Sequence, residues 1–251
     1  TTTEYDSARA STLNAHFTDI AVINAMYDVL HNLGFTKGNI LEPSMGIGNF
    51  FSGLPADMSA SKLYGVELDP VTGRMAQLIY PDAHIEVKGY EKTDFQNDFF
   101  DVAIGNVPFG QYKVLDKAYD KHNFYIHDYF FAKTIDKVRP GGVIAFITSK
   151  GTLDKANPSV RRYMAQRTQL LGAIRLPNDA FKNAGTSVTS DIIFLKKRDM
   201  YIDTDEDWIH LGTDENGIEM NSYFVDNPHM VLGKMEMVSG PHGMESACVP
   251  E

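Results

Sequence analysis

The stretch GNVPFG at 105–110 has residue types that could do chemistry. It follows the apolar run FFDVAI, so Asn106, Val107, Pro108 and Phe109 are expected to project from the carboxyl end of a strand. An amine on a flat ring is a poor nucleophile because its lone pair is delocalised into the ring. Two acceptors on its N–H bonds, the Asn106 side-chain oxygen and the Val107 carbonyl, would free that lone pair. Pro108 would stiffen the loop and Phe109 would stack on the ring, which predicts catalysis without a titrating base.

Two carboxylates and a glycine pair come earlier in the chain. In LEPSMGIGNFFSG, Glu42 ends a strand-like run, and Gly46 and Gly48 permit a tight turn close to a ligand. Position 51 is Phe51 rather than the third glycine of a dinucleotide fingerprint, which disfavours hydride transfer. Glu67 in GVELDP can accept hydrogen bonds from both hydroxyls of a ribose, or is simply an exposed acid at a strand end. The pattern predicts a nucleoside cofactor.

Alternating strands and helices must position these groups. Strand-like runs occur at 39–43, 62–68, 83–87, 99–106, 142–149, 172–177 and 190–197. Helical spacing marks 19–33, 71–80 and 126–138. This alternation predicts an α/β fold, with a mostly parallel sheet covered by helices on both faces. Ligands of such sheets bind beyond the carboxyl ends of the strands.

Composition and apolar runs exclude several classes of protein. The 251 residues are 43% hydrophobic and 22% charged, which does not fit a disordered or fibrous chain. Without a long apolar run or a signal-peptide pattern, the chain is expected to be cytoplasmic with no membrane partner. The single cysteine, Cys248, cannot form an internal disulfide, and His122, His127 and Asp128 lack a second ligand pair at metal spacing. We therefore predict no metal site, and surface or helix-packing roles for these three residues.

The net charge of −10 is unevenly distributed. Residues 199–251 contain twelve acids and one base, whereas 1–198 contain 21 acids and 22 bases. We predict a catalytic core at 1–198 and an acidic C-terminal extension at 199–251 anchored by Trp208, with no sizeable target-recognition domain. The basic residues between 150 and 182 either meet phosphates or form a solvated helix face.

The motifs and their order resemble those of S-adenosylmethionine-dependent adenine-specific DNA methyltransferases with type I-like motif order. GNVPFG resembles their catalytic Asn/Asp-Pro-Pro-Tyr/Phe motif, LEPSMGIGNFF their methionine-binding loop and GVELDP their ribose-binding acid. TLNAHFTDIAVINAM is similar to their leading segment, and RPGGVIAFITSKGTLDK and AIRLPNDAFKNAGTSVTSDIIFLKK to their later motifs. The resemblance covers about residues 11–198 in the family's order.

This resemblance implies a Rossmann-like class I methyltransferase fold, with a seven-stranded sheet in which one strand is reversed. It implies methyl transfer from S-adenosylmethionine to the 6-amino group of adenine in DNA, taken as a flipped base or from a single strand. The implied cofactor contacts come from an N-terminal segment at 11–34 and from later loops. They are Phe17, Thr18, Glu42, Pro43, Ser44, Gly46, Gly48, Glu67, Leu68 and Tyr90.

Some assignments stay open at this point. Asp94 is an alternative to Tyr90 for reading the cofactor's adenine. Phe181 either flanks an extruded base as a substrate-binding residue or belongs to the core, whereas Phe130 is interpreted as core. Val107 replaces the first proline of the motif, so it keeps the carbonyl acceptor but is expected to loosen the loop.

Within that class, the resemblance is to methylase domains of large helicase–methylase polypeptides from phages, plasmids and conjugative elements, some linked to anti-restriction. The implied partners are DNA, together with further domains of a larger polypeptide or a separate recognition subunit. One alternative is methylation of another planar nitrogen, in a protein glutamine or an RNA base. Another is a catalytically degenerate cofactor-binding or scaffold module.

Overall fold

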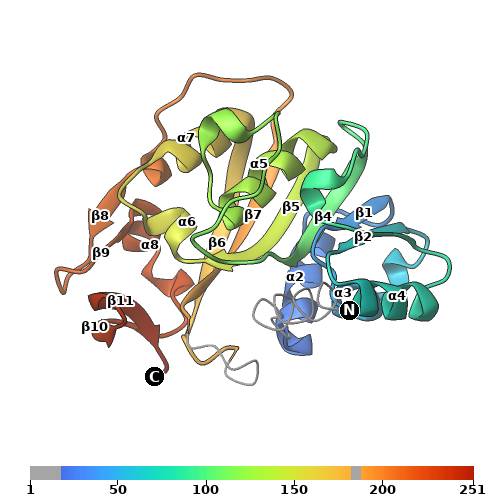
Figure 1. The fold of residues 1–251 in the computed structure, drawn as a ribbon. Helices are drawn as coiled ribbons and strands as arrows, with labels where there is room; N and C mark the ends of the chain where they lie inside the picture. Colours follow the sequence, from blue (N-terminus) through green and yellow to red (C-terminus); the bar gives the residue numbers. More distant parts are fainter. Residues whose placement is uncertain (1–17, 182–187) are drawn as a thin grey trace.

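A seven-stranded sheet forms the centre of the computed structural model, which describes residues 18–181 and 188–251 (Figure 1). The strands are β1 (Asn39–Glu42), β2 (Lys62–Glu67), β3 (His84–Val87), β4 (Phe100–Asn106), β5 (Val138–Ser149), β6 (Thr168–Leu176) and β7 (Ser190–Lys197). Their order is β3-β2-β1-β4-β5-β7-β6. β7 pairs antiparallel with both β5 and β6, and the other pairs are parallel. The predicted α/β fold, with a seven-stranded sheet in which one strand is reversed, is confirmed.

Both faces of this sheet are covered, which explains its nearly continuous apolar strands. In β4, Val102 and Ile104 face one apolar cluster and Ala103 faces the other, as expected for side chains that alternate along a strand. The first cluster packs under α2 (Ile20–Asn32) and α3 (Asn49–Ser52). The second packs under α5 (Ile126–Lys137) and α7 (Ser159–Arg167). α4 (Pro70–Ile79) covers β2 and β3.

Helix starts follow from capping side chains. The Asp19 carboxylate accepts a hydrogen bond from Ala21 N at 2.7 Å, which fixes the start of α2. Asp69 caps α4 by accepting from Thr72 N at 2.8 Å. Among the helices of residues 18–181 and 188–251, none has the length and apolar character of a membrane span.

Two strands begin earlier than predicted. β5 starts at Val138 rather than 142, and β6 at Thr168 rather than 172. Glycines near both starts indicate, from the sequence, that each strand begins after them. The strands nevertheless continue past these glycines, because the pairing shifts register between Phe100 and Val102 opposite β5 and between Leu170 and Gly172 in β6.

The extension at 199–251 packs beside β6 and the helices α6 (Gly151–Asp154) and α7 (Figure 1). Its elements are η5 (Asp207–Ile209), β8 (Leu211–Thr213), β9 (Glu219–Asn221), α8 (Ser222–Asp226), η6 (Pro228–Met230), β10 (Lys234–Gly240) and β11 (Gly243–Val249). Trp208 and Phe224 lie in the same apolar cluster as α5 and α7. The short elements of the preceding part are η1 (Ala56–Met58), η2 (Tyr90–Lys92), η3 (Asp120–His122) and α6 (Gly151–Asp154).

The basic residues between 150 and 182 largely hold this extension. Arg161 and Arg175 are 1% and 0% exposed, so a solvated helix face is wrong for them. Arg161 Nε donates to Ile209 O at 2.7 Å, and Arg162 pairs with Asp205 at 3.0 Å. These side chains therefore contact protein groups of the extension. The number of basic residues alone could not distinguish this role from contact with phosphates.

Candidate active site

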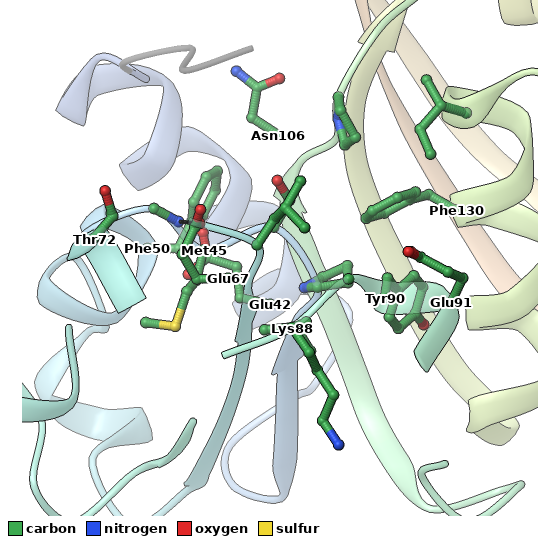
Figure 2. A pocket seen from close by; sticks show the side chains of 18 of the residues that line it. Glu42, Met45, Phe50, Glu67, Thr72, Lys88, Tyr90, Glu91, Asn106 and Phe130 are labelled. Atoms are coloured by element: carbon green, nitrogen blue, oxygen red, sulfur yellow. Dashed lines mark hydrogen bonds between the residues drawn. The ribbon is translucent and has the colours of Figure 1, made fainter. Parts of the chain in front are cut away.

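A pocket of about 250 Å³ lies at the carboxyl ends of β1, β2 and β4 (Figure 2). It lies beside the β1–β4 boundary, where the strand order reverses and α/β sheets bind ligands. The predicted site residues that line it are Thr18, Glu42, Pro43, Ser44, Gly46, Glu67, Leu68, Tyr90, Asn106 and Pro108. Those that do not line it are Gly48, Val107, Phe109 and Phe181. Phe17 lies outside the described residues.

Asn106 ends β4 with its amide against the N-terminal segment. Its Nδ2 donates to Thr18 Oγ1 at 3.2 Å, which joins residues 88 positions apart. The side chain is buried, and Oδ1 has no hydrogen-bond partner in the part of the chain that the structure describes. An unpaired buried acceptor is unfavourable, so this oxygen is prepared to receive a donor from a ligand.

Val107 is held by the sheet. Its backbone N donates to Ile147 O at 3.1 Å, which continues the β4–β5 pairing one residue beyond Asn106. A proline could not make this bond. The Val107 side chain is completely buried in the cluster under α5, against which Phe109 also packs. The loop thus gains a hydrogen bond where the family motif has a rigid ring, and the stacking role of Phe109 stays a prediction.

Glu42 and Glu67 bring two carboxylates into the pocket (Figure 2). Glu42 is 2% exposed and its Oε2 has no partner among the residues described. Burial raises the pKa of Glu42 well above its ordinary range, and the charge of Glu67 raises it further. An unpaired carboxylate in such a place favours a cationic or hydroxyl-bearing ligand.

Glu67 organises the glycine turn. Its Oε2 accepts from Gly46 N at 2.7 Å, and Oε1 accepts from Asp69 N at 3.0 Å. Glu67 is 8% exposed, and burial raises its pKa although these backbone bonds act in the opposite direction. The alternative of an exposed acid at a strand end is therefore wrong. Gly48 has φ of +89°, and a Cβ there would lie 2.5 Å from a ring carbon of Tyr80.

Of the two residues that the sequence offers for contact with the cofactor's adenine, Tyr90 and Asp94, only Tyr90 lies at the pocket. Tyr90 lines the pocket, with its hydroxyl 2.9 Å from Thr134 Oγ1 and its ring 4.8 Å from that of Phe130. Asp94 is exposed and does not line the pocket. Phe130, interpreted as core from the sequence, is both buried and part of the pocket wall.

Phe181 is 3% exposed and packs in the cluster under α2, as the core interpretation describes. Its contact with a base stays a prediction. Sequence reasoning missed other residues of the wall, namely Met45, Ile47, Asn49, Phe50, Val66, Thr72, Lys88, Gly89, Glu91, Tyr112, Val114 and Ile126. Lys88 and Glu91 lie close to Tyr90 in the chain, so the argument that placed the turn after the third strand at the pocket could also have indicated them. Tyr112 and Val114 lie in an irregular loop, where no periodicity indicates which side chains turn inward.

Comparisons with known proteins agree with this geometry. Residues 2–221 match the sequence model of the family described as N-6 DNA Methylase. Defense against restriction protein B of Escherichia phage P1 is 29% identical over 191 residues, which are 74% of this chain but 8% of that protein.

Two solved structures share the fold. One, from Vibrio vulnificus YJ016, is assigned as a modification subunit of a type I restriction enzyme; it has 15% identity and a TM-score of 0.61, covering 94% of this chain and 59% of that one. The other is the M protein of the type I restriction enzyme EcoKI, with 18% identity and a TM-score of 0.56, covering 72% and 44%. This chain thus spans only part of the length of each protein.

Proposed function

This chain belongs to the N-6 DNA methylase family, and from that premise we propose that it transfers a methyl group from S-adenosylmethionine to the 6-amino group of adenine in DNA. The observation that carries the proposal is the unpaired, buried Oδ1 of Asn106 at the pocket. An acceptor at this position suits an amino group that must lose its conjugation with a ring before it can act as a nucleophile. The family membership and the unpaired Asn106 oxygen therefore support the same reaction.

The pocket fits the cofactor in its donor set. The unpaired Oε2 of Glu42 suits the ammonium group of the methionine part, and Glu67 suits the ribose hydroxyls. Gly46 has no side chain, so a ligand can approach its backbone closely at the same wall. The ring of Tyr90, also in the wall, suits packing against an adenine. When bound, S-adenosylmethionine supplies an electrophilic methyl group on a sulfonium.

The chain's own residues then hold and polarise the target amine. Asn106 Oδ1 accepts one N–H bond and the Val107 carbonyl accepts the other, so that two negative dipole ends lie beside the nitrogen where positive charge develops. Pro108 limits the freedom of the loop, and Phe109 stacks on the base. These groups act through position and electrostatics, without a titrating base.

Replacing Asn106 tests this assignment. We expect Asn106→Ala to lower methyl transfer by at least about 10²-fold, because one acceptor on the amine is lost. Cofactor affinity, measured by isothermal titration calorimetry, should change little. Asn106→Asp is the matched control, since it keeps an oxygen acceptor and should retain more activity than the alanine variant. If affinity and turnover fell in parallel in Asn106→Ala, the residue would be a cofactor ligand and the assignment would fail.

We also propose that target selection needs further domains of a larger polypeptide or a separate recognition subunit. The fraction of each similar protein that this chain covers supports this, because most of the length of its phage relative lies outside the matched part. DNA is the proposed substrate, and the acidic net charge of −10 means that only a local surface can attract it.

A further inference from the structure

An exposed tyrosine next to the pocket wall has two ammonium groups close to its ring. Tyr125 directly precedes α5 and is 38% exposed. Lys113 Nζ lies 5.3 Å from the centroid of this ring and Lys155 Nζ lies 5.6 Å from it. The three side chains come from three separate segments, and we call them the Lys–Tyr–Lys cluster.

The cluster retains positive charge. Lys155 is paired with the fully buried Asp128. Lys113 is exposed and donates to the neutral Asn123 Oδ1 at 2.7 Å, and within 18–181 and 188–251 it pairs with no carboxylate. Its charge is therefore available to an anion. An anion would stabilise this Lys113 ammonium group, because Lys155 beside the same ring is already paired with a carboxylate.

The cluster is continuous with the pocket wall. Tyr112 and Ile126 both line the pocket, and Ile126 N donates to Tyr112 O at 2.9 Å. Lys113 follows Tyr112 in the chain and Tyr125 precedes Ile126, so the same backbone contact places both beside the wall. A nucleotide whose base entered the pocket would have its neighbour and its phosphates close to this edge.

We propose that the Lys–Tyr–Lys cluster binds the DNA strand next to the target adenine, with Tyr125 stacking on an adjacent base and Lys113 contacting a phosphate. This inference rests on the proposed function for the identity of the substrate. The chemistry is that of single-strand binding sites, in which aromatic rings hold bases and ammonium groups follow the backbone. Tyr125 also keeps the Lys113 ammonium near its ring face, so the two contacts support each other.

The test is DNA binding by fluorescence anisotropy, using a labelled adenine-containing oligodeoxynucleotide as single strand and as duplex. Lys113→Gln removes an exposed charge that forms no ion pair with any residue the structure describes. Lys37→Gln is the matched control, because Lys37 precedes β1 and so lies at the opposite end of the strands from the pocket. We expect Lys113→Gln to weaken binding several-fold at about 50 mM salt and to reduce the slope of log affinity against log salt by about 1. Lys37→Gln should match the wild type.

Tyr125→Leu provides a second, independent readout. Loss of stacking should weaken binding by about tenfold, while the salt slope should change less than it does in Lys113→Gln, because the Lys113 charge itself stays. Thermal unfolding of each variant reports whether the fold is intact. Lys155 is left in place, because its removal would leave the fully buried Asp128 carboxylate without its lysine partner.

The outcomes separate this inference from the proposed function. If Lys113→Gln and Lys37→Gln bound DNA alike with equal salt slopes, or if the wild type bound no DNA, the inference would be overturned. Methyl transfer by the wild type together with an unaffected Lys113→Gln would overturn the inference alone. DNA binding that depends on Lys113 and Tyr125, without methyl transfer, would keep the inference and reject the proposed enzyme.

Discussion

Asn106 and Glu42 each hold a buried oxygen that no described residue satisfies, and both line the same pocket. The sequence indicated both residues, because each ends a strand beside a recognisable turn. It could not indicate which atom would stay unpaired. That depends on Thr18, which occupies the Asn106 amide nitrogen and leaves the oxygen free. Long-range pairing of this kind has no local sequence signal.

A substitution at Glu42 separates stability from cofactor binding. The raised pKa means that the folded state keeps its proton to a higher pH than the unfolded chain. Its contribution to stability is therefore fully present below the ordinary pKa of 4.5 and is lost as the pH rises through the raised value. We expect Glu42→Gln to make this fall of stability with pH shallower, as measured by urea unfolding at several pH values.

The same variant should bind S-adenosylmethionine about 10- to 100-fold more weakly, because a hydrogen bond to a charged group contributes about 1.5–3 kcal/mol. Calorimetric titration measures this. Glu86→Gln, a change at a carboxylate of β3 that does not line the pocket, is the control. Unchanged affinity in Glu42→Gln would remove Glu42 from the cofactor site.

Strands β4 and β5 position the proposed catalytic loop as a unit, because their pairing runs to Asn106 and Ile147 and continues through Val107 N. The fold at this level was largely predictable, since buried parallel strands read as apolar runs. The starts of β5 and β6 were not predictable, because a bulge admits glycine inside a strand and local pattern cannot distinguish it from a break.

Restoring the family's proline at position 107 should damage this protein. Val107→Pro removes the hydrogen bond to Ile147 O, and we expect unfolding to become easier by about 1–3 kcal/mol without a gain in methyl transfer. Chemical denaturation measures the change, and Val107→Ala, which keeps the N–H, controls for lost side-chain packing. A proline variant as stable as the wild type and more active would show that the loop is loose, as the sequence had led us to expect.

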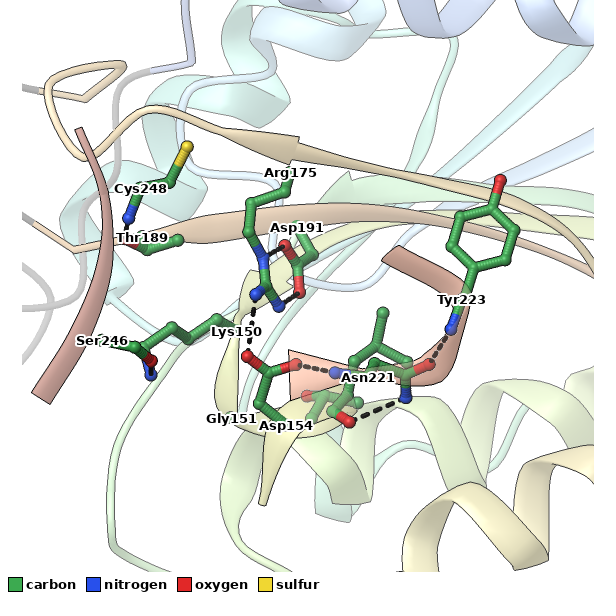
Figure 3. A network of polar contacts seen from close by, with 12 residues as sticks. Lys150, Gly151, Asp154, Arg175, Thr189, Asp191, Asn221, Tyr223, Ser246 and Cys248 are labelled. Carbon is green, nitrogen blue, oxygen red and sulfur yellow. Dashed lines mark hydrogen bonds and ion pairs between the residues drawn. The ribbon is translucent and has the colours of Figure 1, made fainter. Parts of the chain in front are cut away.

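In the whole molecule, the extension at 199–251 shares the apolar cluster of the sheet and is joined to it by a buried polar network (Figure 3). Arg175 on β6 binds Asp191 on β7 through two bonds of 2.8 and 2.9 Å, and it binds Asp154 at 2.8 Å. Asp154 in turn accepts from Asn221 N at 3.0 Å. Composition separated a neutral part from an acidic part, but charge along a chain does not tell which surfaces pack together.

Asn221 is the residue through which this connection can be tested. Its Nδ2 donates to Leu153 O and Trp208 O, both at 2.8 Å, so Asn221→Ala leaves two buried carbonyls without this donor. We expect a loss of about 2–4 kcal/mol in the free energy of unfolding, in a single transition by circular dichroism and by Trp208 fluorescence. Asn216→Ala, in an exposed turn, should stay within about 0.5 kcal/mol of the wild type. Two separate transitions would show that the extension unfolds independently.

The most direct measurement is transfer of labelled methyl from S-adenosylmethionine to unmethylated duplex and single-stranded DNA, with RNA and protein as parallel substrates and mass spectrometry of the product nucleosides. We predict N6-methyladenine from DNA, with the signal lost in Asn106→Ala. Label recovered from RNA or protein instead of DNA, or no transfer to any substrate by a protein that binds the cofactor, would contradict the assignment of this pocket as a DNA adenine methyltransferase site.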